Sequence, residues 1–105
     1  MDLDQLESAL AAFASHAPTS FPLHHVQVFC YVAQEGGCTY RDIEEALNLS
    51  NSTVSRTVHA LGNTHRKGYQ GMDLLELSRD LEEGRRFLIH LTAKGKALKR
   101  QLDKI

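Results

Sequence analysis

Apolar residues recur at helical spacing in the first third of the chain. Residues 1–16 carry one every three or four positions, which predicts an amphipathic helix. A second predicted helix, about 22–35, is apolar on nearly every side, so we expect it to be the most buried element. Gly36-Gly37 ends that helix. The apolar positions of the first helix are Leu3, Leu6, Leu10 and Phe13.

The pattern next predicts two short helices separated by a turn. Thr39 and Asp42 have the capping-box form at the start of the first, and Asn48 suits a left-handed conformation at its end. Ser50 is a good N-cap for the second helix, 51–61. Two such helices form a helix-turn-helix. The apolar positions that we expect to face the core are Ile43, Ala46, Leu47, Val54, Val58 and Leu61.

Alternating apolar residues then replace the helical period. Residues 62–73 are rich in glycine and predict a loop, and the alternation on either side of 80–86 predicts a β-hairpin with its tip there. Thr92 can cap a final basic helix over 93–105, whose apolar positions are Ala97 or Leu98, then Leu102 and Ile105. The fold class predicted is mainly α with a small β-hairpin wing, a single winged helix-turn-helix domain over 1–105. The alternating positions are Leu75, Leu77, Phe87, Ile89 and Leu91.

Composition excludes several classes of protein. No apolar run approaches the ~20 residues of a membrane span, and the acidic start does not resemble a signal peptide, so we expect a cytoplasmic protein with no membrane partner. Cys30 and Cys38 are expected to be free thiols, the first packed in the core and the second exposed beside glycines. Neither the cysteines nor the histidines have a spacing typical of zinc or of a catalytic triad. We therefore expect no metal, no cofactor and no catalysed reaction.

Charge is distributed unevenly along the chain. The formal net charge is −1, which by itself does not favour nucleic acid. Residues 1–40 carry four acids and no Lys or Arg, whereas residues 46–72 carry no carboxylate. The second stretch contains Arg56, Arg66 and Lys67, so its local field is positive.

The solvent side of the predicted helix 51–61 is made of short polar side chains and one arginine. On a recognition helix such side chains allow close approach to base edges, where Arg pairs with guanine and Asn with adenine. A face kept only for solubility would more often carry Glu and Lys. The residues that we expect to contact DNA on this helix are Asn51, Ser52, Thr53, Ser55, Arg56 and His59.

These motifs resemble a known family. The run LSNSTVSRTVHAL, a wing with Glu83 and Arg85, and Leu91-Thr92 with Gly95 are similar to the recognition helix, wing and "LT-x-x-G" motif of MarR-like transcriptional regulators. The similarity covers roughly 38–98. Glu44 departs from the pattern, because many such motifs place a small residue there, and the loop 64–73 is longer than usual.

The resemblance implies how the domain would meet DNA. The recognition helix would enter the major groove, and the wing tip 80–86, with Arg85 and Arg86, would lie at the minor groove. Arg41 would contact a phosphate. Arg66 and Lys67 are either a second phosphate clamp or a solvated loop.

The resemblance further implies a homodimer built from the terminal helices, 1–16 and 93–105, around a DNA-binding core at 39–92. The apolar residues of these helices can also pack within their own domain, so the sequence leaves both a dimer interface and internal packing open. They are Leu3, Leu6, Leu10, Phe13, Leu98, Leu102 and Ile105.

The sequence thus predicts a regulator, most simply a repressor, that binds double-stranded DNA at the nucleoid. Two alternatives remain: a winged-helix module for protein–protein contact, and a DNA-binding protein of replication or partition. A small-molecule effector is compatible with the sequence but has no support from it.

Overall fold

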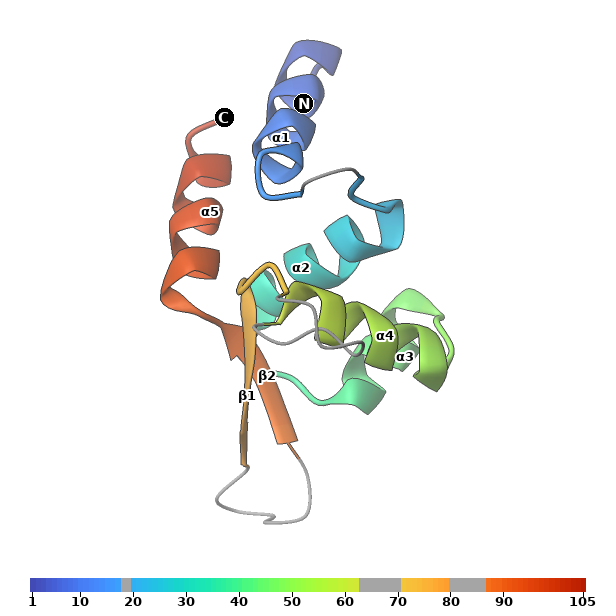
Figure 1. Ribbon diagram of the computed structural model, residues 1–105. Coiled ribbons are helices and arrows are strands. Elements are labelled where there is room, and N and C mark those ends of the chain that lie inside the picture. The colour runs from blue at the N-terminus through green and yellow to red at the C-terminus, as the bar shows by residue number, and fades with distance from the viewer. Residues whose placement is uncertain (18–19, 63–70, 80–86) are drawn as a thin grey trace.

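The computed structural model describes residues 1–17, 20–62, 71–79 and 87–105. Its described elements are five helices and one two-stranded antiparallel sheet (Figure 1). Along the chain they are α1 (Leu3–Ala14), α2 (Leu23–Glu35), α3 (Tyr40–Leu47), α4 (Asn51–Leu61), β1 (Leu75–Arg79), β2 (Phe87–Leu91) and α5 (Ala93–Asp103). The order and the types match the prediction, so the winged helix-turn-helix is confirmed.

Helix α2 forms the centre of the core, as its apolar sequence predicts. Val28, Phe29 and Val32 are fully buried. The ring of Phe13, from the end of α1, meets the ring of Phe29 edge-on with centroids 5.4 Å apart and that of Phe21 at 5.3 Å. These aromatic contacts attach α1 to the rest of the domain.

The turn between α3 and α4 forms through local side-chain chemistry. Thr39 accepts the backbone N–H of Asp42, and the Asp42 carboxylate accepts the N–H of Thr39, which completes the predicted capping box. Asn48 ends α3 in the left-handed region at φ 54°, which asparagine tolerates. Ser50 then caps α4. Of the positions predicted to face inward, Ala46 is exposed, because Ile43 and Leu47, four residues apart, already supply the covered face of this short helix.

The wing is the antiparallel pair β1–β2, with Leu75 opposite Leu91 and Arg79 opposite Phe87. The prediction that Cys38 is exposed is wrong. The backbone N–H and C=O of Cys38 both bond to Ile89, at 3.1 and 2.7 Å, and its side chain is buried. The chain just before α3 therefore extends the sheet at the base of the wing.

Helix α5 starts at a tight junction behind the wing. Thr92 caps it by accepting the N–H of Gly95, while its hydroxyl donates to the carbonyl of Asp73 at 2.6 Å. A Cβ at Gly95 would overlap the carbonyl oxygen of Leu74, so only glycine fits here. The "LT-x-x-G" motif thus joins α5 to the segment just before β1. The sequence predicted only a loop over 62–73 and gave no sign of this contact at the end of the loop.

Figure 1 shows that α1 and α5 occupy one end of the molecule, and α3, α4 and the wing the other. The two terminal helices touch, and Gln5 donates a hydrogen bond to the carbonyl of Ile105 at 3.1 Å. None of the described helices has the length and apolar character needed to cross a bilayer.

Candidate nucleic-acid interface

Helix α4 has one buried and one open side. Val54, Thr57, Val58 and Leu61 are buried. The polar residues expected to contact DNA lie on the other side: Asn51, Ser52 and Arg56 are exposed, and Thr53, Ser55 and His59 are half-buried. The structure therefore gathers all six on one outward surface of one helix.

Several hydroxyl groups of α4 already have internal partners. The Ser50 hydroxyl accepts the Thr53 N–H at 3.2 Å and lies 2.9 Å from the Thr53 hydroxyl. Thr57 donates to the carbonyl of Thr53 at 2.8 Å, and its side chain is buried. Thr57 is thus a core residue in spite of its polarity, because a threonine hydroxyl can bond back to the preceding turn.

The ring of His59 is oriented by the helix backbone. Its Nδ1 lies 2.6 Å from the carbonyl oxygen of Ser55. A carbonyl oxygen can only accept, so Nδ1 carries the hydrogen. In the neutral ring Nε2 is then the acceptor, which defines what His59 can offer to a partner.

Glu44 also lies at this surface, although the sequence predicted no role for it. Helix α4 contains no carboxylate, but α3 brings Glu44 to its first residue, where Glu44 Oε2 accepts from Asn51 Nδ2 at 3.2 Å. An ionised carboxylate cannot donate, so the amide nitrogen of Asn51, and not its oxygen, faces Glu44. The start of α4 is therefore less positive than its own sequence implies.

Arg41 projects from the start of α3 into solvent. Its side chain is 85% exposed, and its Nε donates to Glu45 Oε1 at 3.0 Å. This hydrogen bond, together with the charge of Glu45, raises the pKa of Arg41. This bond uses one of the five N–H donors of the guanidinium, so Arg41 can still offer the others to a phosphate, while the negative charge of Glu45 opposes the approach of that phosphate.

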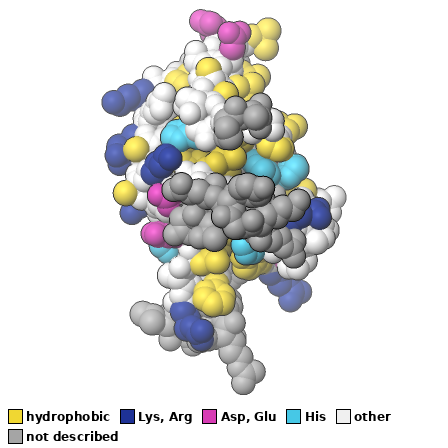
Figure 2. Space-filling view, viewed as in Figure 1, with side chains coloured by type: hydrophobic (Ala, Val, Ile, Leu, Met, Phe, Trp, Pro, Cys, Tyr) yellow, Lys and Arg dark blue, Asp and Glu magenta, His cyan; other side chains and the backbone are white. Residues whose placement is uncertain are grey.

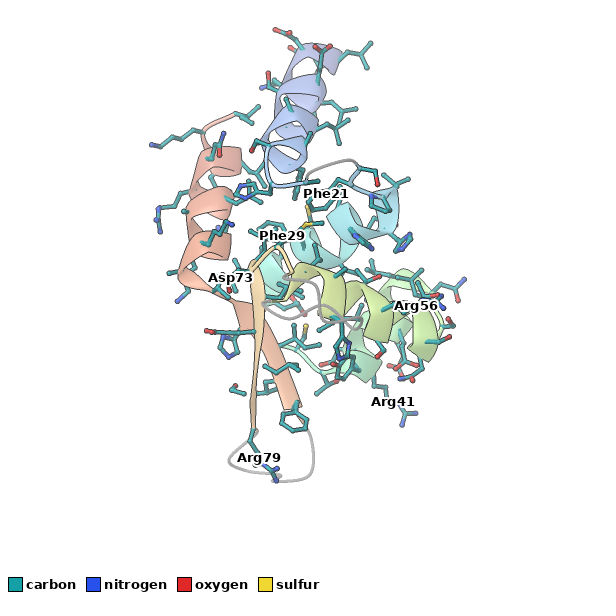
Figure 3. The ribbon with its side chains drawn as sticks, viewed as in Figure 1. Phe21, Phe29, Arg41, Arg56, Asp73 and Arg79 are labelled. Atoms are coloured by element: carbon teal, nitrogen blue, oxygen red, sulfur yellow. The ribbon has the colours of Figure 1, made fainter. Side chains whose placement is uncertain are left out.

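Arg79 is a further basic residue that the predictions omitted. It ends β1 directly before the wing tip, and its guanidinium carbon lies 5.5 Å from the centre of the Phe87 ring. Figure 3 shows Arg41, Arg56 and Arg79 on the half of the molecule that lies away from α1. Its position at the end of the predicted first wing strand could have identified Arg79 from the sequence as a candidate DNA contact. The predicted contacts Arg66, Lys67, Arg85 and Arg86 lie outside the described residues.

Acidic and basic side chains both occur along the molecule. In Figure 2, Asp and Glu side chains lie at the free end of α1 and again at the left edge of the middle part of the molecule, whereas Lys and Arg side chains lie along α5 and around the helix-turn-helix and wing. Among the described residues, no group of three or more His, Cys, Asp or Glu side chains could hold a metal ion.

The apolar residues assigned to a dimer divide into two sets. Phe13 and Leu98 are buried in the core of the single chain, Leu98 to 1% exposure. Leu3, Leu6 and Leu10 are exposed, and Leu102 and Ile105 are half-buried. Leu98 rather than Ala97 is thus the inward position of α5.

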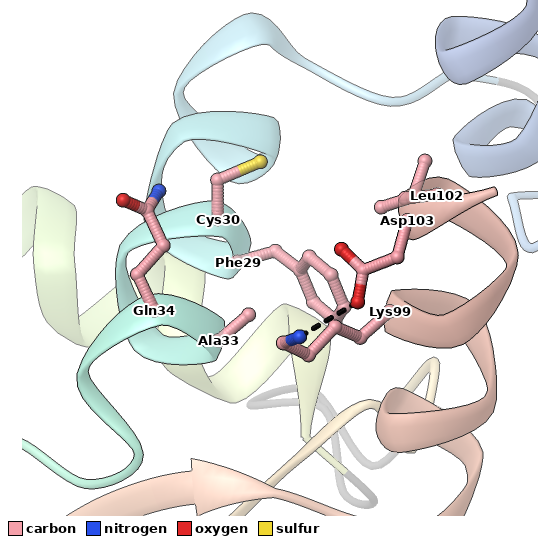
Figure 4. A pocket seen from close by; sticks show the side chains of 7 residues that line it. All are labelled: Phe29, Cys30, Ala33, Gln34, Lys99, Leu102 and Asp103. Atoms are coloured by element: carbon pink, nitrogen blue, oxygen red, sulfur yellow. Dashed lines mark hydrogen bonds and ion pairs between the residues drawn. The ribbon is translucent and has the colours of Figure 1, made fainter. Parts of the chain in front are cut away.

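A pocket of about 340 Å³ lies between α2 and α5 (Figure 4). On its α5 side, Lys99 Nζ donates to Asp103 Oδ2 one turn further along the helix, at 2.8 Å. Burial raises the pKa of the Cys30 thiol, which makes it a poor nucleophile. The lining residues are Phe29, Cys30, Ala33, Gln34, Lys99, Leu102 and Asp103.

Comparison by sequence alone finds no matching family model and no matching curated protein. Comparison of structures finds regulators of one fold. The PcaV transcriptional regulator from Streptomyces coelicolor, in complex with its natural ligand, is 28% identical and matches 96% of this chain and 64% of its own, with a TM-score of 0.63.

Two further structures match a similar share of this chain. MarR from E. coli, complexed with operator DNA, is 17% identical over 94% of this chain and 65% of its own, with a TM-score of 0.65. BpsR from Bordetella bronchiseptica, whose DNA binding is regulated by 6-hydroxynicotinic acid, is 25% identical over 96% and 71%, with a TM-score of 0.62. The chain spans less than two thirds of the PcaV chain with its natural ligand and of the MarR chain with operator DNA.

The PcaV structure is of a transcriptional regulator and the MarR structure contains operator DNA, as expected for the class of protein that the motifs resemble. The match to them begins in α1 and includes the helix-turn-helix, the wing and α5. The resemblance seen in the sequence motifs is thus confirmed: the chain has the MarR-like winged helix-turn-helix fold over nearly its whole length.

Proposed function

We propose that this protein is a transcriptional regulator that binds a specific sequence of double-stranded DNA with α4 in the major groove. The observation that carries the proposal is the open side of α4, where Asn51, Ser52 and Arg56 are exposed and no acid of the helix itself is present. Short polar side chains let a helix approach base edges closely, and Arg56 can pair with a guanine through two hydrogen bonds.

The other basic groups fit backbone contacts. Arg41 lies at the start of α3 and Arg79 at the end of β1, both exposed and at the same end as α4. In this arrangement the wing tip 80–86, with Arg85 and Arg86, would reach the minor groove. Contacts of this kind fix register and supply much of the affinity without reading sequence.

The solved relatives support the same use of the fold. MarR from E. coli was crystallised with operator DNA, and a second structure that matches is also of MarR, described as the multiple antibiotic resistance repressor. By analogy we propose that this protein is a repressor that acts at the nucleoid in the cytoplasm.

A homodimer is part of the proposal. Leu3, Leu6 and Leu10 leave an apolar stripe of α1 exposed, and α1 is acidic where α5 is basic. A second copy would cover the stripe and pair the charges. The two α4 helices would then lie about one DNA turn apart, ~34 Å, and the operator would be palindromic.

Titration of the whole protein with mixed-sequence and selected duplexes tests the proposal. We expect affinity to fall steeply with salt, with a slope near −0.9 per phosphate contact, and the backbone amide signals of α4 to shift. Selection of bound DNA from a random pool returns the motif and its symmetry. If the amides of α4 stay unmoved by every duplex while another surface responds to a protein, the protein-interaction alternative replaces this one.

Sedimentation at rising protein concentration tests the dimer separately. Leu6→Ser should shift the protein towards monomer, and Ser8→Ala, on the same exposed helix, should not. A palindromic motif bound by a protein that is monomeric at all concentrations would contradict this part of the proposal.

A further inference from the structure

We infer that Glu44 is a positioning residue for base readout, which fixes the side chain of Asn51 so that it selects a base carrying an amino group in the major groove. This inference rests on the proposed DNA binding of α4. Its basis is the 3.2 Å hydrogen bond from Asn51 Nδ2 to Glu44 Oε2, which joins the first helix of the helix-turn-helix to the first residue of the second.

The contact is not required to build the turn. Helix α4 already has its N-cap in Ser50, and the two helices pack against each other and contribute Ile43 and Val54 to the same buried core. Asn51 is exposed and Glu44 is half-buried, so a hydrogen bond between them adds little to stability. Its main effect is on the amide of Asn51, whose two ends are otherwise free to exchange places.

The fixed amide determines which chemistry the site presents. With Nδ2 turned to the carboxylate, the acceptor that Asn51 presents outward is Oδ1. Adenine and cytosine offer an amino hydrogen in the major groove, whereas guanine O6 and thymine O4 are acceptors. The pair therefore favours adenine or cytosine and disfavours guanine or thymine at the position it meets.

The charge of Glu44 also decides what Asn51 cannot contact. A carboxylate next to the first residue of α4 repels a phosphate that approaches the same point. The start of α4 therefore suits a base edge better than the DNA backbone. A side chain that is already ordered in the free protein also loses less entropy on binding, which favours a selective contact.

Selection from a random duplex pool, with affinities then measured for all four bases at each position of the site, tests the inference. We expect Glu44→Ala to lose roughly tenfold of the preference for an amino-bearing base at one position, and to leave the preferences elsewhere unchanged. Glu44→Gln should keep the preference, because the glutamine oxygen still accepts from Asn51.

Glu45→Ala is the matched control. It removes the same charge from the next residue, which bonds to Arg41 and not to Asn51, so it should change affinity equally for all sequences. Asn51→Ala should abolish the preference for an amino-bearing base. The double variant Asn51→Ala, Glu44→Ala should then have the same base preference at that position of the DNA site as Asn51→Ala alone. Thermal melts show whether each variant is folded.

The outcomes separate the two proposals. If the wild-type protein binds no duplex, the proposed function fails and this inference with it. If it binds a defined site but Glu44→Ala changes affinity by the same factor for every base, or Glu44→Gln loses the preference as Glu44→Ala does, Glu44 has no role in readout and the DNA binding stands.

Discussion

Helices α4 and α5 each contain 11 residues and begin at a hydroxyl N-cap, Ser50 in one and Thr92 in the other. Both caps accept the backbone N–H three residues on, at 3.2 and 3.0 Å. Neither helix has an acid in its first turn. The two are therefore built by the same local rules, and their differences lie in the side chains that they present.

Those side chains differ in length and charge. Helix α4 carries one arginine among Ser, Thr and Asn, whereas α5 carries Lys94, Lys96, Lys99 and Arg100. The helix richer in charge is the one that lies at the end away from the helix-turn-helix and beside the acidic α1 (Figure 1). A count of basic residues would point to α5, whereas the proposed function assigns recognition to α4, because a recognition helix needs short side chains and close approach more than it needs charge.

Leu98→Ala should have the largest effect on the stability of the domain. Leu98 anchors α5 in the core at 1% exposure, so loss of its side chain leaves a cavity. We expect a loss of about 2–5 kcal/mol in the free energy of unfolding. Chemical denaturation at one low protein concentration measures it.

Leu6→Ala is the control for Leu98→Ala. Leu6 is 41% exposed on α1, so its removal should cost well under the loss at Leu98 in the monomer and should weaken the dimer instead. Equal losses of monomer stability for the two variants would contradict the division of the terminal helices into core and interface residues.

Arg56→Ala tests whether α4, rather than α5, contacts DNA. Loss of a two-bonded guanine contact should weaken binding to the selected site by about 1–3 kcal/mol. Arg100→Ala removes the same side chain from the basic helix and should leave affinity for that site almost unchanged, provided sedimentation shows the same oligomeric state. Fluorescence anisotropy with the selected duplex measures both. If Arg100→Ala has the greater effect, α5 rather than α4 lies on the DNA.

Much of the fold follows from the sequence because its signals are local. The period of Val54, Val58 and Leu61, the capping box at Thr39 and the left-handed Asn48 each depend on residues within one or two turns. Apolar alternation predicted both wing strands for the same reason.

What the sequence did not reveal depends on how distant segments meet. The bond pair between Cys38 and Ile89 exists only once the wing folds back against the start of α3. The contact of Glu44 with Asn51 crosses the turn and needs the angle between two helices. Glu44 was visible as a departure from the family pattern, but its partner was not. Leu98 could be placed in the core only when the packing of α5 was known.

We expect His25, near the start of α2, to make the stability of the domain sensitive to acid. Its ring lies 6.0 Å from that of Phe21, and burial, followed by the nearby His24, lowers the pKa of His25 from 6.5 to about 4. As pH falls below 6.5 the unfolded chain takes up the proton first, so stability decreases between about pH 6.5 and 4 and is constant above that range as far as His25 is concerned. After allowance for solvent screening we expect a loss of about 1–2 kcal/mol.

Denaturation of the wild-type protein and of His25→Gln across this pH range measures the contribution of His25. The variant should lack this part of the slope. An unchanged slope in the variant would exclude His25 as its source.

Arg41→Ala should have the smallest effect. The side chain is exposed and bonded to Glu45, so its loss should barely change the stability of the fold. If Arg41 contacts one phosphate, the variant should weaken binding by the same factor for every duplex and lower the salt slope by about 0.9. Titrations at several salt concentrations measure this.

The opposite change at its partner completes the test. Because Glu45 competes for the guanidinium of Arg41 and offsets its charge, Glu45→Ala should strengthen binding to all duplexes, most of all at low salt. In the Arg41→Ala background the Glu45→Ala gain should shrink to the part that comes from removing a negative charge near DNA. If the gain is the same in both backgrounds, Arg41 makes no contact with DNA, and recognition on this side of the helix-turn-helix depends on α4 alone.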